Sequence, residues 1–405
     1  MSGPLSGVRV IDATTMLSGP WATMILADQG ADVIKVETPG KGDHIRSLGN
    51  RRGGMSSMFL NINRNKRSIA LDLKNPAGVD ALKKLVESAD IFVQNFRPGV
   101  MQRLGLGYEA LKAINPKLIY LSISGFGDEG PWVGKPVYDP VIQAVSGLTT
   151  IQAGSDGERP RLIRTVLPDK LAAVMAAQTM TAALVGRGTE GQGQHIRLSM
   201  LDSVLYFLWA SDMGGLTYPD QADAPATAAS FIDLIYETAD GHMTVSIMSD
   251  KEWRGLCTAF EKPEWLADER FCSAENRDAN VDARLELTQD VLKTMPTAHW
   301  MALLEKHDVP CAPALTRREV IAHPQVIANN ILLEYHHPAA GPLRQTRAPA
   351  RFEKTPTAHR SGAPLLNEHG AELLAEVGYD SSAIEKLRHD GALGLDPEQT
   401  REQAA

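Results

Sequence analysis

The chain has 405 residues, of which 43% are hydrophobic and 22% charged, which is enough for two or three ordinary globular domains with a large core. Its formal net charge of −8 argues against nucleic-acid binding, which usually needs a basic face, but it does not exclude an anionic ligand held by local charge. No stretch approaches the roughly 18 continuous apolar residues of a membrane span, so we expect no membrane segment.

The first 125 residues alternate short apolar runs with helical segments. Strands are expected over 7–13, 33–37, 68–72, 91–94 and 118–124, and helices over 20–29, 76–88 and 108–114. A strand, a helix and a second strand in succession form the unit of a parallel sheet. The repetition predicts an α/β fold with a large doubly wound, Rossmann-like domain.

The pattern changes at Asp169. The elements expected from there are a buried Ala-, Met- and Leu-rich helix over 169–186, an apolar helix over 198–213, a linker over 214–227, a β-hairpin over 232–247, helices over 251–260, 281–293 and 297–307, extended chain over 343–352 and a helix over 367–377. The hairpin and the helices after it indicate a smaller second domain of the α+β type.

The loop after the first strand lacks both usual phosphate-binding fingerprints. It reads Met16-Leu17-Ser18-Gly19-Pro20 where a dinucleotide-binding protein carries GxGxxG, and no Walker pattern occurs. Dehydrogenase and kinase functions are therefore disfavoured.

Basic residues gather in the expected loops and strand ends of the α/β domain. They are Arg64, Lys66, Arg67, Lys74, Arg97 and Arg103. Loops at the carboxyl ends of parallel strands bind ligands in open α/β sheets, and Arg or Lys there suits phosphate groups. A solvated surface is the alternative for each residue. Asn95-Phe96-Arg97-Pro98-Gly99 directly follows an apolar strand, and a Phe beside an Arg there suits contact with a planar base.

Asp169 opens the Ala-rich helix, and two interpretations of it stay open. As an N-cap, its carboxylate would accept a hydrogen bond from a backbone N–H of the helix. The same helix N-terminus would also hold a carboxylate ionised, and an ionised carboxylate can act as a covalent nucleophile. Composition does not decide between the two.

Residue types that support other chemistry are scattered. The 11 histidines show no HxxxH or HxH spacing, and His336-His337 lies in an expected loop, so no metal site is predicted. No Ser occupies GxSxG, which leaves a hydrolase triad without support. Three widely spaced cysteines, Cys257, Cys272 and Cys311, argue against a disulfide scaffold or zinc site and fit the reducing cytoplasm, where we expect the protein to lie.

Seven longer segments of the chain form a set of motifs. They are GVRVIDATTMLSGPWATMILADQGADVIKVE, NRNKRSIALDLK, NFRPGVMQRLGLGYEAL, SISGFGDEGP, GQGQHIRLSMLDSV, VPCAPALTRREVIAHPQV and APLLNEHGAELLAEVGY. Together they resemble the class III CoA-transferases, the group of formyl-CoA transferase and carnitine CoA-transferase. As a set these motifs are specific, and they cover nearly the whole chain. The resemblance implies a large CoA-binding domain built from both chain ends, 1–213 and 330–405, a small domain over 228–329, and two chains interlocked as rings in a homodimer.

The resemblance also implies the chemistry. Asp169 matches the family's catalytic aspartate, which takes the acyl group of a donor acyl-CoA to give a mixed anhydride and free CoA thiolate. The thiolate attacks the anhydride, leaving an aspartyl-CoA thioester and releasing the donor acid, and the acceptor acid repeats the steps in reverse. Coenzyme A and acyl-CoA are substrates, and neither a metal nor a permanently bound cofactor is implied.

The family's CoA contacts carry over onto loops of the large domain. They are Leu71, Asp72, Leu73, Lys74, Asn95, Phe96, Arg97, Arg103 and Tyr138. The chain departs from formyl-CoA transferases, which carry Gln in place of Leu17, Arg in place of Thr38 and Lys in place of Pro136, and their glycine-run loop has no counterpart near Gly241. These departures argue against formate and oxalate as substrates, and family base rates favour succinyl-CoA with a small dicarboxylic or hydroxy acid.

Two alternative functions remain beside the transferase. An α-methylacyl-CoA racemase on the same fold pairs a His with an Asp to move the α-proton. The Gly-His-Asp segment of those enzymes reads Val137-Tyr138-Asp139 here, so one proton carrier is missing. A non-catalytic CoA-binding protein is disfavoured by the presence of Asp169.

Overall fold

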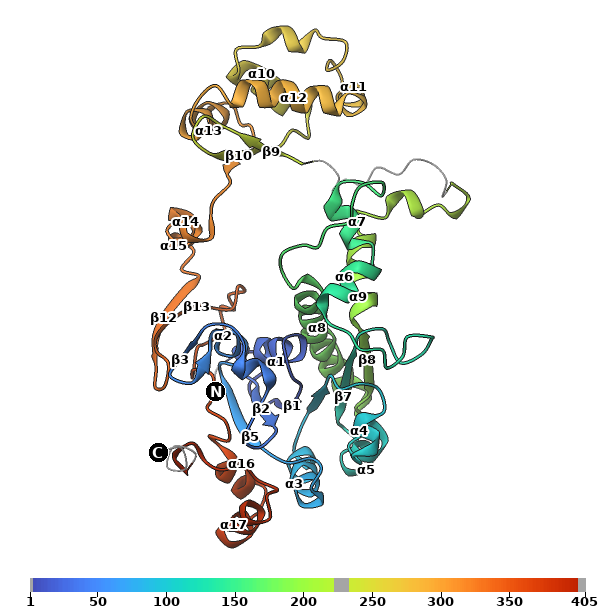
Figure 1. Cartoon of the computed structure of the whole chain (residues 1–405), viewed down its shortest axis with the longest axis vertical. Helices are drawn as coiled ribbons and strands as arrows, with labels where there is room; N and C mark the ends of the chain where they lie inside the picture. Colours follow the sequence, from blue (N-terminus) through green and yellow to red (C-terminus); the bar gives the residue numbers. More distant parts are fainter. Residues whose placement is uncertain (1–2, 222–232, 400–405) are drawn as a thin grey trace. The chain divides into compact units, whose positions relative to one another are not determined.

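The computed structural model of the protein describes residues 3–221 and 233–399, which divide into two compact units (Figure 1). Unit 1 comprises Met1–Ala229 and Asn330–Ala405, and unit 2 comprises Ser230–Asn329. Unit 1 thus contains residues from both ends of the chain.

A six-stranded parallel sheet forms the centre of unit 1, in the order β5-β2-β1-β6-β7-β8. Counted along the chain among themselves, these strands follow the order 3-2-1-4-5-6 of a doubly wound fold. The order reverses between β1 and β6, which is the switch point where such folds bind ligands. The strands are β1 Arg9–Ala13, β2 Asp32–Glu37, β5 Lys66–Ala70, β6 Ile91–Gln94, β7 Ile119–Ser124 and β8 His195–Ser199.

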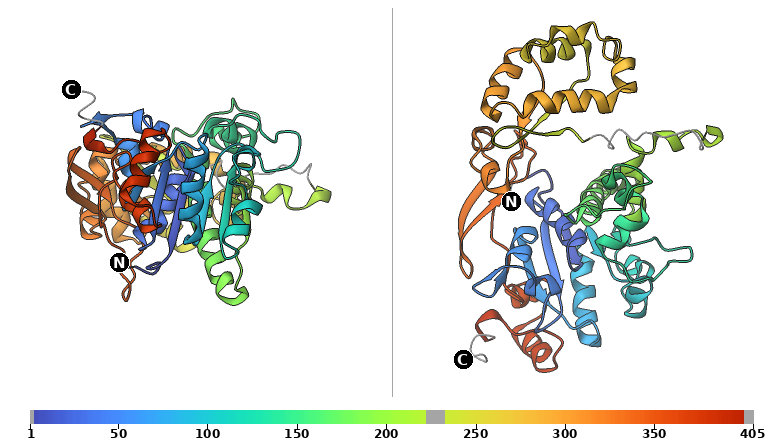
Figure 2. Two further views of the ribbon diagram at one scale, coloured as in Figure 1. Left: turned by 90° about the horizontal axis from the view of Figure 1, so that it is seen from below. Right: turned by 45° about the horizontal axis from the view of Figure 1, so that its top comes forward.

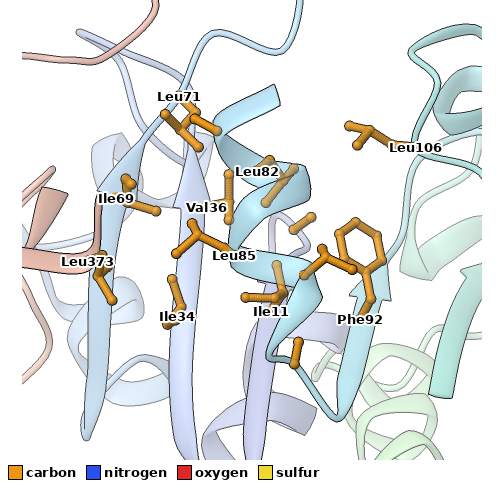
Figure 3. Close-up of a cluster of buried hydrophobic side chains, with 14 of the residues drawn as sticks. Ile11, Ile34, Val36, Ile69, Leu71, Leu82, Leu85, Phe92, Leu106 and Leu373 are labelled. Carbon is orange, nitrogen blue, oxygen red and sulfur yellow. The ribbon is translucent and has the colours of Figure 1, made fainter. Parts of the chain in front are cut away.

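Helices cover both faces of this sheet, because successive strand residues point to opposite faces and both sets are apolar. On one face Ile11, Ile34 and Phe92 pack with Leu82 and Leu85 of α3 (Figure 3). On the other face the strands pack against α1 and α8. The predicted α/β fold with a parallel central sheet is confirmed.

The helices of unit 1 up to residue 209 lie between these strands along the chain, except α9, which follows the last of them. The helices are α1 Ser18–Asp28, α2 Ser57–Ile62, α3 Pro76–Glu87, α4 Val100–Arg103, α5 Tyr108–Ile114, α6 Asp139–Val145, α7 Leu148–Ala153, α8 Leu167–Glu190 and α9 Met200–Trp209, and the short strands β3 Arg51–Arg52 and β4 Met55–Ser56 form a hairpin before α2. Across residues 3–221 and 233–399, no helix combines the length and apolar character needed to cross a membrane.

α1 and α8 pack directly against each other on their face of the sheet. The buried side of α8 carries Ala172, Ala173, Ala176 and Ala177. Small side chains at a helix contact allow the two axes to approach closely. The Ala-rich composition of this segment thus brings α8 against α1 along its length.

The C-terminal segment packs beside β5 and α3 within unit 1. Leu373 and Leu374 of α16, and Ile384 and Leu387 of α17, join the same core as α3. Figures 1 and 2 show these helices, in red, beside the blue strands. The elements after residue 330 are β12 Leu332–His337, β13 Gly341–Thr346, α16 Gly370–Glu376 and α17 Ser381–His389.

Unit 2 is built around an aromatic core and a three-stranded antiparallel sheet in the order β11-β10-β9. Trp253, Phe260, Trp265 and Trp300 are buried together in this core. The elements of unit 2 are β9 Ile235–Glu237, β10 His242–Val245, β11 Cys311–Pro313, α10 Asp250–Ala259, α11 Ala274–Ala279, α12 Val281–Leu292, α13 Thr297–Lys306, α14 Arg317–Val320 and α15 Pro324–Ala328.

Two predicted boundaries in unit 1 are wrong for identifiable reasons. The strand expected over 68–72 begins two residues earlier, at Lys66, because the side chain of this lysine is buried and ion-paired rather than solvated. The helix expected over 198–213 begins at Met200. The residues before it, His195–Ser199, form the edge strand β8, which continues directly into the helix.

Later predictions are partly confirmed. The hairpin expected over 232–247 is present as β9 and β10, although its first residue and residues 222–227 of the expected linker lie outside the described residues. Of the extended chain expected over 343–352, residues up to 346 belong to β13. The prediction of a loop at His336-His337 is wrong, because these residues end β12, where they pair with β13.

Candidate active site

The carboxyl ends of the parallel strands bring together the N-termini of α1 and α8. α1 directly follows β1, and α8 is the crossover helix between β7 and β8, so both helices begin at this edge of the sheet. The switch point between β1 and β6 lies at the same edge. Ligands of doubly wound folds bind in the crevice outside it, so side chains in the first turns of both helices are candidates for chemistry.

Asp169 lies in the first turn of α8 but does not cap it. The helix begins at Leu167, its N-cap is Val166, and no side chain accepts a capping hydrogen bond there. The hydroxyl and the backbone N–H of Ser18, the first residue of α1, face the Asp169 carboxylate and lower its pKa. The N-cap interpretation is therefore wrong, and the carboxylate instead faces the N-terminus of a different helix.

A second carboxylate, that of Asp139, lies beside Asp169. The backbone N–H of Asp169 donates to Asp139 Oδ2 (3.2 Å), and Gln143 Nε2 donates to Asp139 Oδ1 (2.7 Å). Gln143 also accepts from the Ile163 N–H (2.9 Å) and donates to the Thr165 carbonyl (3.0 Å). Gln143 thus bonds both to Asp139 and to the segment that leads into α8. Asp139 in turn accepts a hydrogen bond from the backbone N–H of Asp169.

Burial and the neighbouring carboxylate change the acidity of Asp169. Burial first, and the charge of Asp139 second, raise the pKa of Asp169 from its ordinary value of 3.8 to about 6, against the hydrogen bonds from Ser18. Burial also raises the pKa of Asp139, with Gln143 acting in the opposite direction. Asp169 is still mostly ionised at neutral pH, and a partly desolvated carboxylate is a stronger nucleophile than a hydrated one.

Ser18, Asp139 and Gln143 carry no sequence motif that predicts a role at this site. Ser18 and Asp169 meet only because the doubly wound topology starts both of their helices at one edge. One local signal was present, since Asp139-Pro140 has the residue types favoured in the first turn of a helix. α6 does begin at Asp139.

The predicted CoA contacts after β5 lie at this edge of the sheet. Lys74 is exposed, and Asp72 shapes the turn by accepting from the Lys74 N–H (2.9 Å). Leu73 is half-buried against the core. The side chain of Leu71 is only 1% exposed and its backbone pairs with Leu393, so this side chain belongs to the core.

The predicted contacts after β6 form a second group. Asn95 Oδ1 accepts from the Thr15 N–H (2.9 Å), and Asn95 Nδ2 donates to the Thr15 carbonyl (2.8 Å), so the loops after β1 and β6 are joined at the switch point. Phe96 is half-buried, whereas Arg97 and Arg103 are exposed. The two arginines, but not the carboxamide of Asn95, therefore face solvent.

The spacing of these groups suits an extended anionic ligand. β5 and β6 are separated by β2 and β1, so the loops that follow them are about 14 Å apart at roughly 4.8 Å per strand. Lys74 lies on one side of this interval, and Arg97 and Arg103 lie on the other. Tyr138, whose side chain is 70% exposed, immediately precedes the buried Asp139. Among the described residues, no group of three or more His, Cys, Asp and Glu side chains has a metal-binding arrangement.

Three of the predicted phosphate-binding residues lie elsewhere. Lys66 and Arg67 begin β5 and Arg64 precedes it, so they belong to the amino end of that strand. Arg64 pairs with Asp28 (2.5 Å) and Lys66 with Asp12 (2.8 Å), all four side chains being buried, and Arg67 pairs with a carboxylate of β2 (2.6 Å). The phosphate-binding and the solvated-surface interpretations are both wrong for these residues, which form structural ion pairs.

The chain matches known proteins over nearly its whole length. The family model described as CoA-transferase family III matches residues 5–370. The acetyl-CoA:oxalate CoA-transferase of Acetobacter aceti is 37% identical over 380 residues, 92% of this chain and 96% of that protein. The succinyl-CoA:glutarate CoA-transferase of Mus musculus is 34% identical over 396 residues, 96% and 90% of the two chains. The crystal structure of a CAIB/BAIF family protein from Brucella suis matches with a TM-score of 0.80 at 32% identity, over 93% of this chain and 100% of that one. The chain therefore belongs to CoA-transferase family III and is an enzyme of coenzyme A transfer.

Proposed function

We propose that the enzyme moves CoA from a donor acyl-CoA to an acceptor carboxylic acid through covalent intermediates on Asp169. The Asp169 carboxylate attacks the thioester carbonyl, the C–S bond breaks, and CoA leaves as thiolate from a mixed anhydride. The thiolate attacks the Asp169 carbonyl, which releases the donor acid as its carboxylate and leaves an aspartyl-CoA thioester. The acceptor carboxylate attacks this thioester, and the steps run in reverse to give the new acyl-CoA and free Asp169.

The surroundings of the Asp169 carboxylate are the observation that carries this proposal. The group is half-buried, has a pKa of about 6 and faces the hydroxyl and backbone N–H of Ser18, which lower that pKa. Each attack on the Asp169 carbonyl passes through a tetrahedral oxyanion. In this proposal the Ser18 N–H and the positive end of α1 stabilise the oxyanion, and preorganised donors of this kind are worth about 10²–10³ in rate.

We place CoA along the carboxyl edge of the sheet, with its thioester at Asp169. The exposed Lys74, Arg97 and Arg103 suit the phosphate groups, because cations at this edge gain charge-assisted hydrogen bonds without breaking a buried ion pair. The half-buried ring of Phe96 suits the adenine base. Leu71 contributes through its backbone, since its side chain lies in the core.

We also propose that two chains form the interlocked homodimer that the resemblance implies, in the cytoplasm. α9 exposes Tyr206, Phe207 and Trp209 by 75%, 45% and 50%. Large aromatic side chains exposed side by side are typical of a surface that a partner covers. This feature supports association between chains.

The relatives guide the choice of substrates. The names of two of them give oxalate and glutarate as acceptors, and both are dicarboxylic acids. We propose a dicarboxylic acceptor for this enzyme, with succinyl-CoA or acetyl-CoA as donor. Leu17 places an apolar side chain next to Ser18, which favours an acceptor with a longer carbon chain than oxalate.

An acyl-exchange screen tests the proposed function. The purified protein is incubated with succinyl-, acetyl- or formyl-CoA and a library of carboxylic acids, and new acyl-CoA species are identified by mass spectrometry. We expect a new thioester of a dicarboxylic acid from the wild type and none from Asp169→Ala. If no new thioester forms but a 2-methylacyl-CoA loses its α-deuterium, the protein is instead a racemase.

The variant Asp139→Asn tests the coupling between the two carboxylates. Wild-type activity should fall as the pH drops through about 6, because protonated Asp169 is not a nucleophile. Without the charge of Asp139 the pKa of Asp169 decreases, so the acid limb of kcat/KM should move to lower pH, with at most about a tenfold loss at pH 7.5 from weaker positioning. The pH–rate profile measures this effect, and Asp156→Asn, at an exposed position in the same unit, is the control. An unmoved acid limb in Asp139→Asn would contradict the coupling.

A further inference from the structure

The segment from Thr14 to Ser18 carries Ser18 to Asp169, and side chains from outside the segment hold its backbone. The Thr14 N–H donates to Asp12 Oδ1 (3.0 Å), the Thr14 carbonyl accepts from Lys35 Nζ (3.0 Å), the Thr15 N–H and carbonyl bond to Asn95 (2.9 and 2.8 Å), and the Met16 N–H donates to Asp43 Oδ1 (3.0 Å). Each backbone group from the Thr14 N–H to the Met16 N–H thus has a side-chain partner.

Three of the holding groups, Asp12, Lys35 and Asp43, are charged and completely buried, and a fourth buried charge, Lys66, pairs with Asp12. Lys35 Nζ lies 3.0 Å from Asp43 Oδ2, Lys66 Nζ lies 2.8 Å from Asp12 Oδ2, and all four side chains are 0% exposed. Buried ion pairs add little net stability, since apolar residues of similar volume are often as good or better. Three buried charges bonded to one short segment are therefore better explained by the geometry that they impose on it.

The backbone of the segment needs such restraint. Met16 has a φ of +69°, in the left-handed region that side chains other than glycine rarely adopt. Gly19 approaches Thr14 so closely that an added Cβ would lie 2.3 Å from the Thr14 side chain. Without its partners the segment would relax at Met16, and Ser18 would move with it.

We infer that the buried pair of Lys35 and Asp43 positions the Thr14–Ser18 segment so that the Ser18 donors meet the Asp169 carboxylate. The pair acts through Thr14 and Met16, with which it makes hydrogen bonds, so both members are positioning residues. The inference rests on the proposed function of Asp169 and adds to it two residues, Lys35 and Asp43, that are not among the predicted catalytic or CoA-binding residues.

The position of Ser18 affects the pH dependence of the reaction. Ser18 lowers the pKa of Asp169, whereas burial and Asp139 raise it, and Lys170 acts on Asp139. If the Ser18 donors withdraw, the pKa of Asp169 rises further. The acid limb of kcat/KM then moves to higher pH, opposite to the shift expected for Asp139→Asn.

Two variants of the pair and one matched control test the inference. In Asp43→Asn only one oxygen remains. If it accepts from the Met16 N–H, the amide NH2 lies against Lys35; if it turns toward Lys35, the Met16 N–H loses its acceptor. The double variant Lys35→Met/Asp43→Leu removes both charges together, which avoids an unpaired buried charge and keeps the protein folded if Asp43→Asn is too unstable. The control Asp28→Asn breaks the buried pair with Arg64 at the last turn of α1, about 15 Å along the helix from Ser18.

We expect kcat to fall about tenfold or more in both variants of the pair, with the acid limb moved to higher pH and the KM for acyl-CoA within about threefold of wild type. Asp28→Asn should lose stability but keep the wild-type pH profile. The inference is overturned if the pair variants keep the wild-type acid limb, or if Asp28→Asn changes kcat and pH profile as they do. An active Asp169→Ala, measured alongside, would instead overturn the proposed function itself.

Discussion

Replacing Asp169 by alanine lowers the rate of acyl exchange by about 10⁴-fold or more, because the variant has no group that can carry the acyl moiety between donor and acceptor. Binding of CoA should persist, since the side chains proposed to hold it lie in other loops. Initial rates of exchange, with CoA binding followed by calorimetry, measure the two properties separately. An exchange rate within tenfold of wild type would contradict the role of Asp169.

The variant Asp169→Asn separates a loss of catalysis from a loss of the fold. The raised pKa of Asp169 predicts that this variant is more stable than the wild type at neutral pH. The folded state raises the pKa of Asp169 from 3.8 to about 6 and so favours the protonated form. Above pH 6 the ionised carboxylate therefore destabilises the folded state, by up to about 3 kcal/mol, and below pH 3.8 this cost is absent. Asp169→Asn should accordingly unfold at a higher temperature than wild type at pH 7.5 while being inactive.

The variant Asp12→Asn has the largest expected effect on stability, a loss of about 3–5 kcal/mol in the free energy of unfolding. Asp12 is 0% exposed and accepts hydrogen bonds from the Thr14 N–H (3.0 Å), Thr23 Oγ1 (2.7 Å) and Lys66 Nζ (2.8 Å). Burial works to raise the pKa of Asp12, but Lys66 and Lys35 outweigh it and hold the pKa below its ordinary range. The substitution leaves Lys66 buried without its closest counter-ion, and it lowers further the Lys66 pKa, which burial already lowers to about 8.

Urea unfolding followed by circular dichroism measures this loss. The control is Glu87→Gln, which breaks an exposed ion pair with Lys84 on α3 and should cost less than about 1 kcal/mol. A loss for Asp12→Asn no larger than that of the control would show that the buried charges beneath α1 are not coupled as the structure indicates.

The α/β fold was predictable because its strands are apolar on both faces. β1, β2, β6 and β7 appear as short apolar runs, and turn residues separate them from helices of different periodicity. β8 was missed because it is an edge strand in which His195 and Arg197 alternate with apolar residues, and because it runs directly into α9. Where the local pattern weakens at an edge, tertiary pairing decides the structure.

The candidate site was predictable only where a family motif marked it. Asp169 was identified, but its acidity depends on Ser18 and Asp139, which lie far from it in the sequence and meet it through the topology of the sheet. For Lys66, by contrast, the local sequence predicts the wrong environment. A lysine next to Arg67 in a basic motif predicts an exposed cation, whereas packing against Asp12 buries it completely.

The most direct test of the account is a mass measurement on the enzyme during turnover. The wild type is incubated with the acyl-CoA donor found in the exchange screen, quenched in acid and digested, and its peptides are weighed. We predict that the peptide containing Asp169 gains the mass of CoA less one water, the signature of an aspartyl-CoA thioester, and that adding the acceptor acid removes this gain. Turnover without a mass gain on that peptide, or with the gain on another residue, would contradict covalent catalysis by Asp169.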